Sequence, residues 1–316
     1  MSGLRKMLEI LIPTYNRQAE LVKNIVHMND LVCKENLEGK IRLIVSDNAS
    51  TDNTSVEIKK IIPEVSFDIV HYKQDKNIGL ENNAVFVLRQ ATTDYIVFLG
   101  DDDYLPEGYL SKLVEITENQ EFGVVIPGFS ALMPGGDIKP GRRDMRQREH
   151  EPGFNALYDF SNFGHQLSGL FFRREGVVEA YLDDEENRNI YLFIFFICYG
   201  LKKYKSTYLP EYQVLVTQGG AKDWSYDQSG LLTEIFKNFR ATYPQSAVKR
   251  FWLCFAMMRN QSWRLRVGIN PLLAAKAMLH LMVSSSVDVL VKISLPVLVP
   301  YFYFTTLSSL IKRKVL

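Results

Sequence analysis

The chain has 316 residues, of which 47% are hydrophobic and 23% charged, and this composition excludes a disordered protein. Its 37 basic and 36 acidic residues give a net charge of +1, which argues against a nucleic-acid-binding protein. The cysteines Cys33, Cys198 and Cys254 are too widely spaced for a disulfide framework or a zinc site, and favour a reducing compartment. No apolar secretory segment follows Met1, so we expect a protein that stays in the cytosol or on a membrane facing it.

The first half of the chain alternates strand-like and helix-like stretches. Short apolar runs predict strands at residues 8–12, 41–45, 67–72 and 95–99, and helical spacing predicts helices at 18–31, 56–62 and 83–90. This alternation is typical of parallel strands joined by crossover helices in a three-layer α/β sheet. Because open α/β sheets bind ligands beyond the carboxyl ends of their strands, we expect the chemistry to follow the first, second and fourth strands.

The rest of the chain is less regular. We expect strands at 124–129 and 167–172, a helix at 190–199, and helices at 231–239 and 251–258. Residues 133–153 are rich in glycine, proline and charge, which predicts a loop. The character of the chain changes near residue 218, so we divide it into a catalytic domain, 1–217, and a helical C-terminal region, 218–316.

Three adjacent carboxylates, Asp101, Asp102 and Asp103, follow the strand at 95–99. Such carboxylates repel one another, so a fold tolerates them where a cation or a set of donors compensates their charge. Hard oxygen ligands suit Mg²⁺ or Mn²⁺, held with help from a substrate phosphate. A solvated acidic turn ahead of a helix near Pro106 is the structural alternative.

A second polar cluster follows the strand at 41–45. Asp47 has the chemistry to bond the edge of a base or ribose hydroxyls, while Ser50 and Asp52 stabilise the turn. The same residue types form an N-cap with Asx-turns ahead of the helix at 56–62. The sequence alone leaves both roles open.

Two weaker motifs complete the set. At residues 12–17, Pro13 is expected to end the first strand, and the guanidinium of Arg17 suits phosphate oxygens. Further along, Gly79 permits close approach of the backbone, with the side-chain amide of Asn77 nearby.

Taken in order, these four segments resemble the family 2 glycosyltransferases of the GT-A fold, well over residues 7–130 and loosely over 160–215. The resemblance implies a divalent metal, Mn²⁺ or Mg²⁺, bound principally by Asp102 with Asp103 assisting. It implies nucleotide contacts from Pro13, Thr14, Tyr15, Arg17, Asp47, Asn77, Gly79 and Asp101. Many relatives have an acidic residue where Gly100 stands, which leaves open which of the three carboxylates binds metal.

The resemblance also implies a catalytic base in an acidic pair ahead of a late helix. The nearest match is the acidic turn at 183–186, in which Glu186 and then Asp184 are our candidates. Residues 187–189 lie closer to the expected position, and an acidic turn that favours the dipole of the following helix has the same composition. His165 is a further candidate base, for which a structural histidine is the alternative.

The implied reaction is an inverting transfer of a sugar from a nucleotide-diphosphate sugar to a hydroxyl of a lipid-linked saccharide, in bacterial O-antigen or capsule synthesis. The acceptor hydroxyl attacks the anomeric carbon while a carboxylate takes its proton. A nucleotidyltransferase is an alternative, although residues 12–17 lack the glycines of its usual phosphate loop. A non-catalytic, membrane-bound nucleotide-sugar-binding module is the other.

The C-terminal tail is strongly apolar. Residues 293–311 carry no charge and are flanked by Lys292 and Lys312. This length approaches the roughly 20 residues of a membrane span, but Pro296 and Pro300 argue against a straight one. We expect peripheral or monotopic attachment to an anionic membrane surface, at the cytoplasmic face of the bacterial inner membrane. A helical bundle packed on the catalytic domain is the alternative.

Overall fold

The structure, a computed structural model, describes residues 8–219, 231–265, 267 and 270–315. Its first half alternates strands and helices, as the apolar pattern predicts. The elements are β1 (Leu8–Thr14), α1 (Gln18–Lys34), β2 (Ile41–Asp47), α2 (Thr54–Ile61), β3 (Asp68–Lys73), α3 (Leu80–Gln90), β4 (Tyr95–Phe98) and α4 (Tyr109–Asn119).

The middle of the chain holds more structure than its sequence indicates. The elements are β5 (Val124–Leu132), β6 (Ile138–Pro140), β7 (Arg148–His150), α5 (Phe154–Phe160), the 3-10 helix η2 (Ser161–His165), β8 (Phe171–Arg173), α6 (Val177–Leu182), the 3-10 helix η3 (Glu185–Asn187), α7 (Leu192–Lys203) and β9 (Ser206–Thr217). The prediction of a loop at 133–153 was wrong in part, because β6 and β7 lie there. Both are short and polar, so no apolar alternation marks them.

The C-terminal region is helical, as predicted. It contains α8 (Leu232–Thr242), α9 (Ala247–Asn260), the 3-10 helix η5 (Ser262–Leu265), α10 (Pro271–Val283) and α11 (Val289–Val315). Pro296 and Pro300 lie inside α11 rather than ending it. Within the described part of the chain, no helix has both the length and the hydropathy that crossing a membrane requires.

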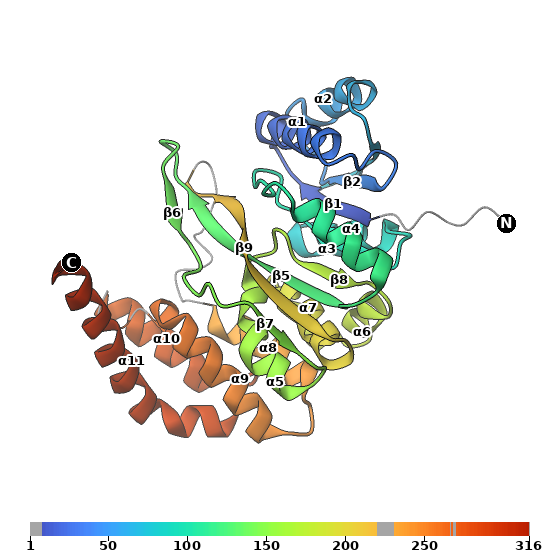
Figure 1. Cartoon of the computed structure of the whole chain (residues 1–316). Coiled ribbons are helices and arrows are strands. Elements are labelled where there is room, and N and C mark those ends of the chain that lie inside the picture. The colour runs from blue at the N-terminus through green and yellow to red at the C-terminus, as the bar shows by residue number, and fades with distance from the viewer. Residues whose placement is uncertain (1–7, 220–230, 266, 268–269, 316) are drawn as a thin grey trace.

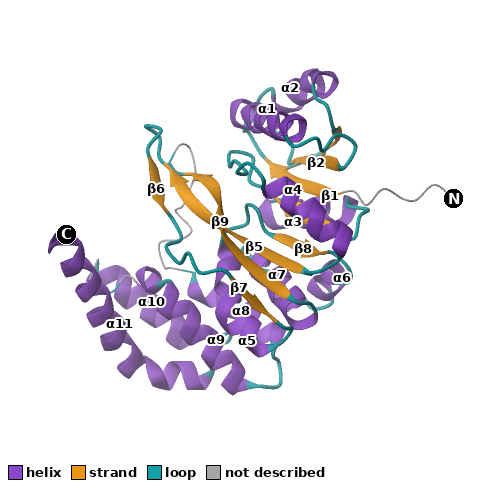
Figure 2. Cartoon of the chain, viewed as in Figure 1, coloured by secondary structure: helices purple, strands orange, loops and turns teal. Residues whose placement is uncertain are grey.

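The strands form one sheet in the order β3-β2-β1-β4-β8-β5-β9-β7, with β6 beside β5 (Figure 2). Strands β3, β2, β1 and β4 are parallel, whereas β8 runs antiparallel to both β4 and β5. The prediction that Pro13 ends the first strand was wrong, because β1 continues to Thr14. Pairing of β1 with β4 stops at Leu11, so the missing N–H of Pro13 falls beyond the last bond on that side.

Two hydrophobic cores lie on opposite faces of this sheet. On β1, Ile10 and Ile12 point to the face covered by α1, α2 and α4, and Leu11 points to the face covered by α3 and α7. The alternation follows from the two-residue period of a strand, and apolar residues on both faces are typical of a sheet buried between helices. The result is the three-layer arrangement of Figure 1, with α1 and α2 far from α11.

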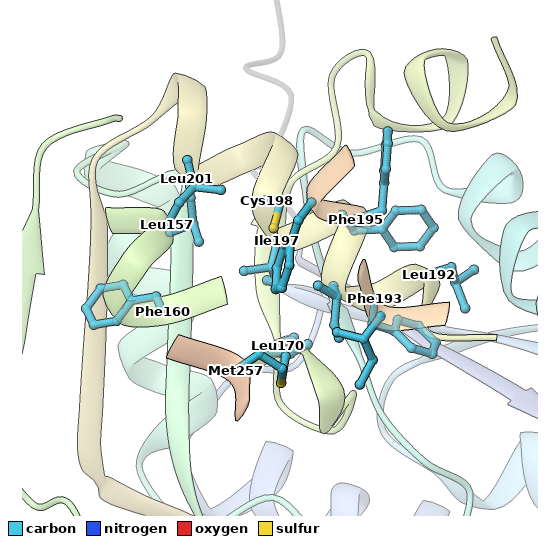
Figure 3. Close-up of a cluster of buried hydrophobic side chains, with 14 of the residues drawn as sticks. Leu157, Phe160, Leu170, Leu192, Phe193, Phe195, Ile197, Cys198, Leu201 and Met257 are labelled. Atoms are coloured by element: carbon cyan, nitrogen blue, oxygen red, sulfur yellow. The ribbon is translucent and has the colours of Figure 1, made fainter. Parts of the chain in front are cut away.

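Helix α7 lies at the centre of the second core. Its side chains are buried on nearly every side, among them Phe193, Phe195 and Ile197 (Figure 3). Helices α5, α8 and α9 contribute to the same cluster, so the C-terminal helices pack directly on the helical layer beneath the sheet. The domain boundary predicted at residue 218 falls between β9 and α8 and stays a prediction.

Candidate active site

The acidic triplet forms a tight turn beyond the end of β4. The backbone N of Asp103 donates to the carbonyl O of Gly100 at 3.3 Å, which places Asp101 and Asp102 at the two central positions of a β-turn. A Cβ on Gly100 would lie 2.8 Å from Oδ2 of Asp103, so the carboxylate of Asp103 occupies the space that a side chain there would need. A side chain at position 100 would therefore require the carboxylate of Asp103 to shift.

The three carboxylates have different surroundings. Thr14 donates from Oγ1 to Oδ2 of Asp101 at 2.7 Å. Asp102 is buried, and its backbone oxygen accepts a hydrogen bond from Oγ1 of Thr217. Asp103 accepts hydrogen bonds at both carboxylate oxygens, from Oγ of Ser168 and from the backbone N of Thr217, the latter at 2.9 Å. Asp103 therefore ties the turn to the segment before β8 and to the end of β9.

The loop after β2 is organised by Asp47, which is fully buried and lies opposite Thr14 in the β1–β2 pairing. Its Oδ1 accepts from the backbone N of Ser50 at 2.8 Å, and its Oδ2 accepts from Oγ of Ser55. These bonds stabilise the turn between β2 and α2, but Asp47 does not cap α2, whose N-cap residue is Asn53. The predicted contact with a base stays a prediction.

Residues after β1 form the neighbouring wall of the site. Asn16 adopts a φ of 53° and accepts a hydrogen bond from the backbone N of Thr51 at 2.8 Å, which joins the loops after β1 and β2. Tyr15 is 42% exposed, so its ring is open to solvent. Arg17 lies 3.7 Å from Glu20 in the first turn of α1.

The segment before α3 joins the same edge. Nδ2 of Asn48 donates to Oδ1 of Asn77 at 2.9 Å, and Oδ1 of Asn48 accepts from the backbone N of Ile78 at 2.8 Å. Gly79 has a φ of +83°, a conformation that side chains disfavour, and an added Cβ would meet open space. The requirement for glycine is therefore conformational. The structure thus brings the segments after β1, β2, β3 and β4 together, as the parallel arrangement predicts.

The acidic turn at 183–186 is exposed and overlaps the start of η3. Oδ1 of Asp184 accepts from the backbone N of Glu186 at 2.8 Å, so Asp184 caps this short helix. The side chain of Glu186 makes no hydrogen bond or ion pair with any described residue. Arg188 donates to Glu81, in the first turn of α3, at 3.0 Å, and this contact ties the acidic turn to the edge that carries Gly79.

His165 has the surroundings of a structural histidine. Its ring bonds the carbonyl O of Asn162 at 2.7 Å, and desolvation together with nearby Arg142 lowers its pKa to about 3. Arg142 itself lies over the ring of Phe163 at 4.0 Å and donates to the carbonyl O of Pro127 at 2.6 Å. With so low a pKa, His165 is a weak general base near neutral pH.

The donor set of the turn fits a hard divalent cation, because two carboxylates at adjacent turn positions supply oxygen ligands and a substrate phosphate can supply more. Among the described residues, no three or more histidine, cysteine, aspartate or glutamate side chains gather as a metal-binding group. The fit therefore rests on Asp101 and Asp102.

Sequence reasoning missed several residues that shape the site. Ser168 and Thr217 hold Asp103, but each lies in a stretch without a distinctive pattern. Asn48 lies in the polar cluster after the second strand, and its role in joining two loops was not predicted. Asn24 donates to both ends of the acidic turn. It stands on the apolar face of α1, three residues after Leu21, where an amide is out of place, and that position could have revealed it.

A family model described as "Glycosyl transferase family 2" matches residues 9–182, more than half of the chain. The abequosyltransferase RfbV of Salmonella typhimurium is 30% identical over 114 residues, which are 36% of this chain and 33% of that protein. A Campylobacter jejuni GalNAc(5)-diNAcBac-PP-undecaprenol beta-1,3-glucosyltransferase is 34% identical over 112 residues, 34% of this chain and 33% of that protein. The matched segment thus spans about a third of the length of these relatives.

Solved structures share the fold over most of the chain. Staphylococcus aureus TarS 1-349 in complex with UDP-GlcNAc has a TM-score of 0.64 at 14% identity, over 94% of this chain and 87% of that one. The mannosyltransferase PcManGT of Pyrobaculum calidifontis, in complex with GDP-Man and Mn²⁺, has a TM-score of 0.54 at 16% identity, over 93% and 79%. At these identities the likeness establishes the fold alone, and it agrees with the GT-A architecture expected from the sequence.

Proposed function

The chain belongs to glycosyl transferase family 2, and from this premise we propose that it transfers a sugar from a nucleotide-diphosphate sugar to an acceptor hydroxyl, with inversion at the anomeric carbon. One observation carries the proposal: Thr14, Asn48, Asn77 and the acidic turn meet at the carboxyl edge of the parallel strands, joined by hydrogen bonds between loops. Ligands of open α/β sheets bind at this edge.

For the donor, we assign the nucleotide to the wall formed by the segments after β1 and before α3. The exposed ring of Tyr15 offers a flat apolar face on which a base can stack. Open space at Gly79 permits the nucleotide to approach the backbone. Arg17 and Pro13 belong to the same wall, and the guanidinium of Arg17 supplies a cation toward the phosphates.

For the metal, we assign Asp102 as the principal ligand and Asp101, oriented by Thr14, as its helper. Asp103, which the sequence predicts as a ligand, has both carboxylate oxygens bonded to Ser168 and Thr217, so we assign it an anchoring role. A divalent cation bound here supplies a Lewis acid that neutralises the charge of the departing diphosphate.

For the base, we keep Glu186 first and Asp184 second. Asp184 is engaged as a helix cap, whereas the carboxylate of Glu186 is available to accept a proton from the attacking hydroxyl. Support for this choice comes from Arg188, which follows the turn and bonds Glu81 at the start of α3.

For the acceptor and location, we propose a lipid-linked saccharide in bacterial surface-polysaccharide synthesis, at the cytoplasmic face of the inner membrane. The name of the Campylobacter relative includes an undecaprenol carrier, and that of the Salmonella relative a deoxysugar, which supports this class of pathway. The outward surface of the C-terminal helices gives an independent physical reason to propose a location at a membrane.

Between residues 289 and 304, every exposed side chain of α11 is apolar, aromatic or proline. The large ones are Val289, Leu290, Ile293, Val297, Tyr301, Tyr303 and Phe304. The opposite stripe of the helix, with Val291, Leu295 and Phe302, is buried against the fold. So large an exposed apolar surface is unusual on a soluble domain and suits a helix lying in a membrane interface.

The proposed function is tested by screening UDP-, GDP-, dTDP- and CDP-sugars with Mn²⁺ for thermal stabilisation, and then assaying transfer of the best donor to a lipid-linked saccharide. A bound donor raises the melting temperature by mass action. We expect one nucleotide class to stabilise the protein and its sugar to appear on the acceptor. A binding module would be stabilised without transferring or hydrolysing the donor. A nucleotidyltransferase would instead release pyrophosphate from a nucleoside triphosphate.

A further inference from the structure

Asn24 is a buried amide in an apolar setting. It lies on the core-facing side of α1, among Leu21, Ile25 and Met28, and none of its surface is exposed. An amide removed from water is costly unless it forms hydrogen bonds, so its position in the core needs a reason.

The reason lies in the acidic turn. Nδ2 of Asn24 donates to the carbonyl O of Gly100 at 2.9 Å and to the carbonyl O of Asp103 at 2.6 Å. These two carbonyls belong to the first and last residues of the turn that carries Asp101 and Asp102. The two hydrogens of one nitrogen therefore clamp both ends of the turn. Inverting the amide would set its oxygen against two carbonyl oxygens, so its orientation is determined.

This clamp has a cost. Oδ1 of Asn24 is buried and has no hydrogen-bond partner among the residues that the structure describes. Most buried polar groups are paired, so an orphaned oxygen calls for an explanation. An apolar side chain would remove this oxygen, but it would also remove the two N–H groups that bond the carbonyls of Gly100 and Asp103. The protein thus retains a buried oxygen without a partner among the described residues at Asn24, the residue that restrains the acidic turn.

A second contact shows that the restraint involves the whole unit of β1 and α1. Thr14, at the end of β1, bonds the carboxylate of Asp101, and Asn24, in the second turn of the helix that follows, bonds the backbone on both sides of Asp101 and Asp102. The segment between them, residues 15–17, is part of the proposed nucleotide wall. The two contacts set the distance between that wall and the two carboxylates.

We propose that Asn24 is a positioning residue, which holds Asp101 and Asp102 in the geometry that binds a divalent cation together with the donor diphosphate. This inference rests on the proposed function. Asn24 touches neither metal nor donor; it acts through the backbone of the turn. Its loss should therefore weaken metal binding more than it weakens the fold.

The test compares Asn24→Leu with Leu31→Ala. Leu31 is buried on the same side of α1, two turns further along, so its truncation destabilises the helix packing without touching the turn. Mn²⁺ is titrated, with electron paramagnetic resonance as the readout, in the presence of whichever of UDP, GDP, dTDP or CDP stabilises the wild-type protein most. Melting temperatures without metal are measured in parallel. If Asn24→Leu does not fold, Asn24→Ala removes the same donors.

We expect Asn24→Leu to raise the Kd for Mn²⁺ about tenfold, and saturating Mn²⁺ to restore part of the lost turnover. Leu31→Ala should lower the melting temperature and leave the Kd unchanged. A folded Asn24 variant with wild-type Mn²⁺ affinity overturns the positioning role alone. A wild-type protein that binds no Mn²⁺ with any of the four nucleotides overturns the proposed metal-dependent transfer, and the role of Asn24 with it.

Discussion

The carboxylate of Asp103 accepts a hydrogen bond from the backbone N of Thr217 at 2.9 Å, although the two residues are 114 positions apart. The contact joins the acidic turn after β4 to the last residue of β9. With Ser168 on its other oxygen, Asp103 is bonded internally on both sides. The position of the turn therefore depends on the C-terminal half of the sheet. Asp103 anchors the turn, whereas Asp101 and Asp102 are the proposed metal ligands.

This division of tasks predicts different effects for Asp102→Asn and Asp103→Asn. Asp102→Asn should lower turnover by about 100-fold or more, since it removes the principal metal ligand, and should leave the melting temperature near that of the wild type. Asp103→Asn should lower the melting temperature, because an amide cannot accept from both Ser168 and Thr217. Turnover assays and calorimetry on both variants check this. Wild-type turnover and metal dependence in Asp102→Asn would refute the assignment.

The second prediction concerns Asp47, whose carboxylate organises its own loop and is also predicted to contact the nucleotide base. Asp47→Ala should weaken donor binding and also lower stability by about 1–3 kcal/mol, because it leaves buried donors unpaired. Ser55→Ala is the matched control, since it removes one bond to Asp47 and keeps the carboxylate. Calorimetric donor titration of both variants separates the effects. Equal donor affinity in the wild type and in Asp47→Ala would leave Asp47 only its role in stabilising the turn.

The sequence predicts the parallel half of the fold well, because there the pattern that marks each strand or helix lies within a few consecutive residues. Ile10, Leu11 and Ile12 are apolar on both faces of one strand, and such runs, alternating with helices, imply parallel strands between helical layers. The carboxyl edge follows from that topology, so Thr14 and Asp101 were expected near one another.

The rest of the site depends on contacts between distant segments. Thr217 ends a strand that pairs with β5 across a β-bulge, and Ser168 stands in a loop, so nothing in their local sequence marks them as partners of Asp103. For Asp47, stabilisation of the turn and contact with a ligand require the same carboxylate, and a pattern of residue types cannot separate two uses of one group.

The third prediction concerns the base. Glu186→Gln should lower turnover by roughly 10²–10⁴-fold with donor affinity unchanged, because the amide cannot take the proton of the acceptor hydroxyl. Asp184→Asn should have a smaller effect on turnover, since Asp184 serves as the cap of η3. Single-turnover kinetics and donor titration are the measurements. If both variants, together with the alanine variants of Asp183 and Glu185, keep wild-type turnover, the base lies outside this turn.

The fourth prediction is a dependence of stability on pH. Burial and Arg142 lower the pKa of His165 from 6.5 to about 3, so between these values the unfolded chain binds a proton that the folded chain does not. The free energy of unfolding should therefore fall as the pH drops below 6.5, by at most about 1.4 kcal/mol per pH unit for this one group. Urea unfolding at several pH values should show a smaller slope in His165→Gln. Replacing the exposed His280 is the control, and identical slopes in all three proteins would contradict this assignment.

The last prediction concerns the membrane. Removing the tail after residue 268 is an ambiguous test, because α10 and α11 also bury Leu281, Val291 and Phe302 against the fold, and truncation would uncover that core. Substitution of outward side chains leaves those contacts in place.

We therefore predict that Ile293→Glu with Val297→Glu, at side chains 67% and 72% exposed, greatly reduces flotation of the protein with anionic liposomes. Two apolar side chains then no longer enter the membrane interface, which weakens the free energy of membrane binding by about 3 kcal/mol or more. In addition, the anionic lipid headgroups repel the new carboxylates. Val26→Glu with Val56→Glu is the matched control, with side chains 47% and 50% exposed on α1 and α2, away from α11 (Figure 1). The melting temperature and donor binding should remain at wild-type values in both double variants, because all four positions face solvent. Transfer to a lipid-linked acceptor in liposomes should fall only in the α11 variant, whereas equal flotation of both variants would leave α10 and α11 as a packed bundle without a membrane role.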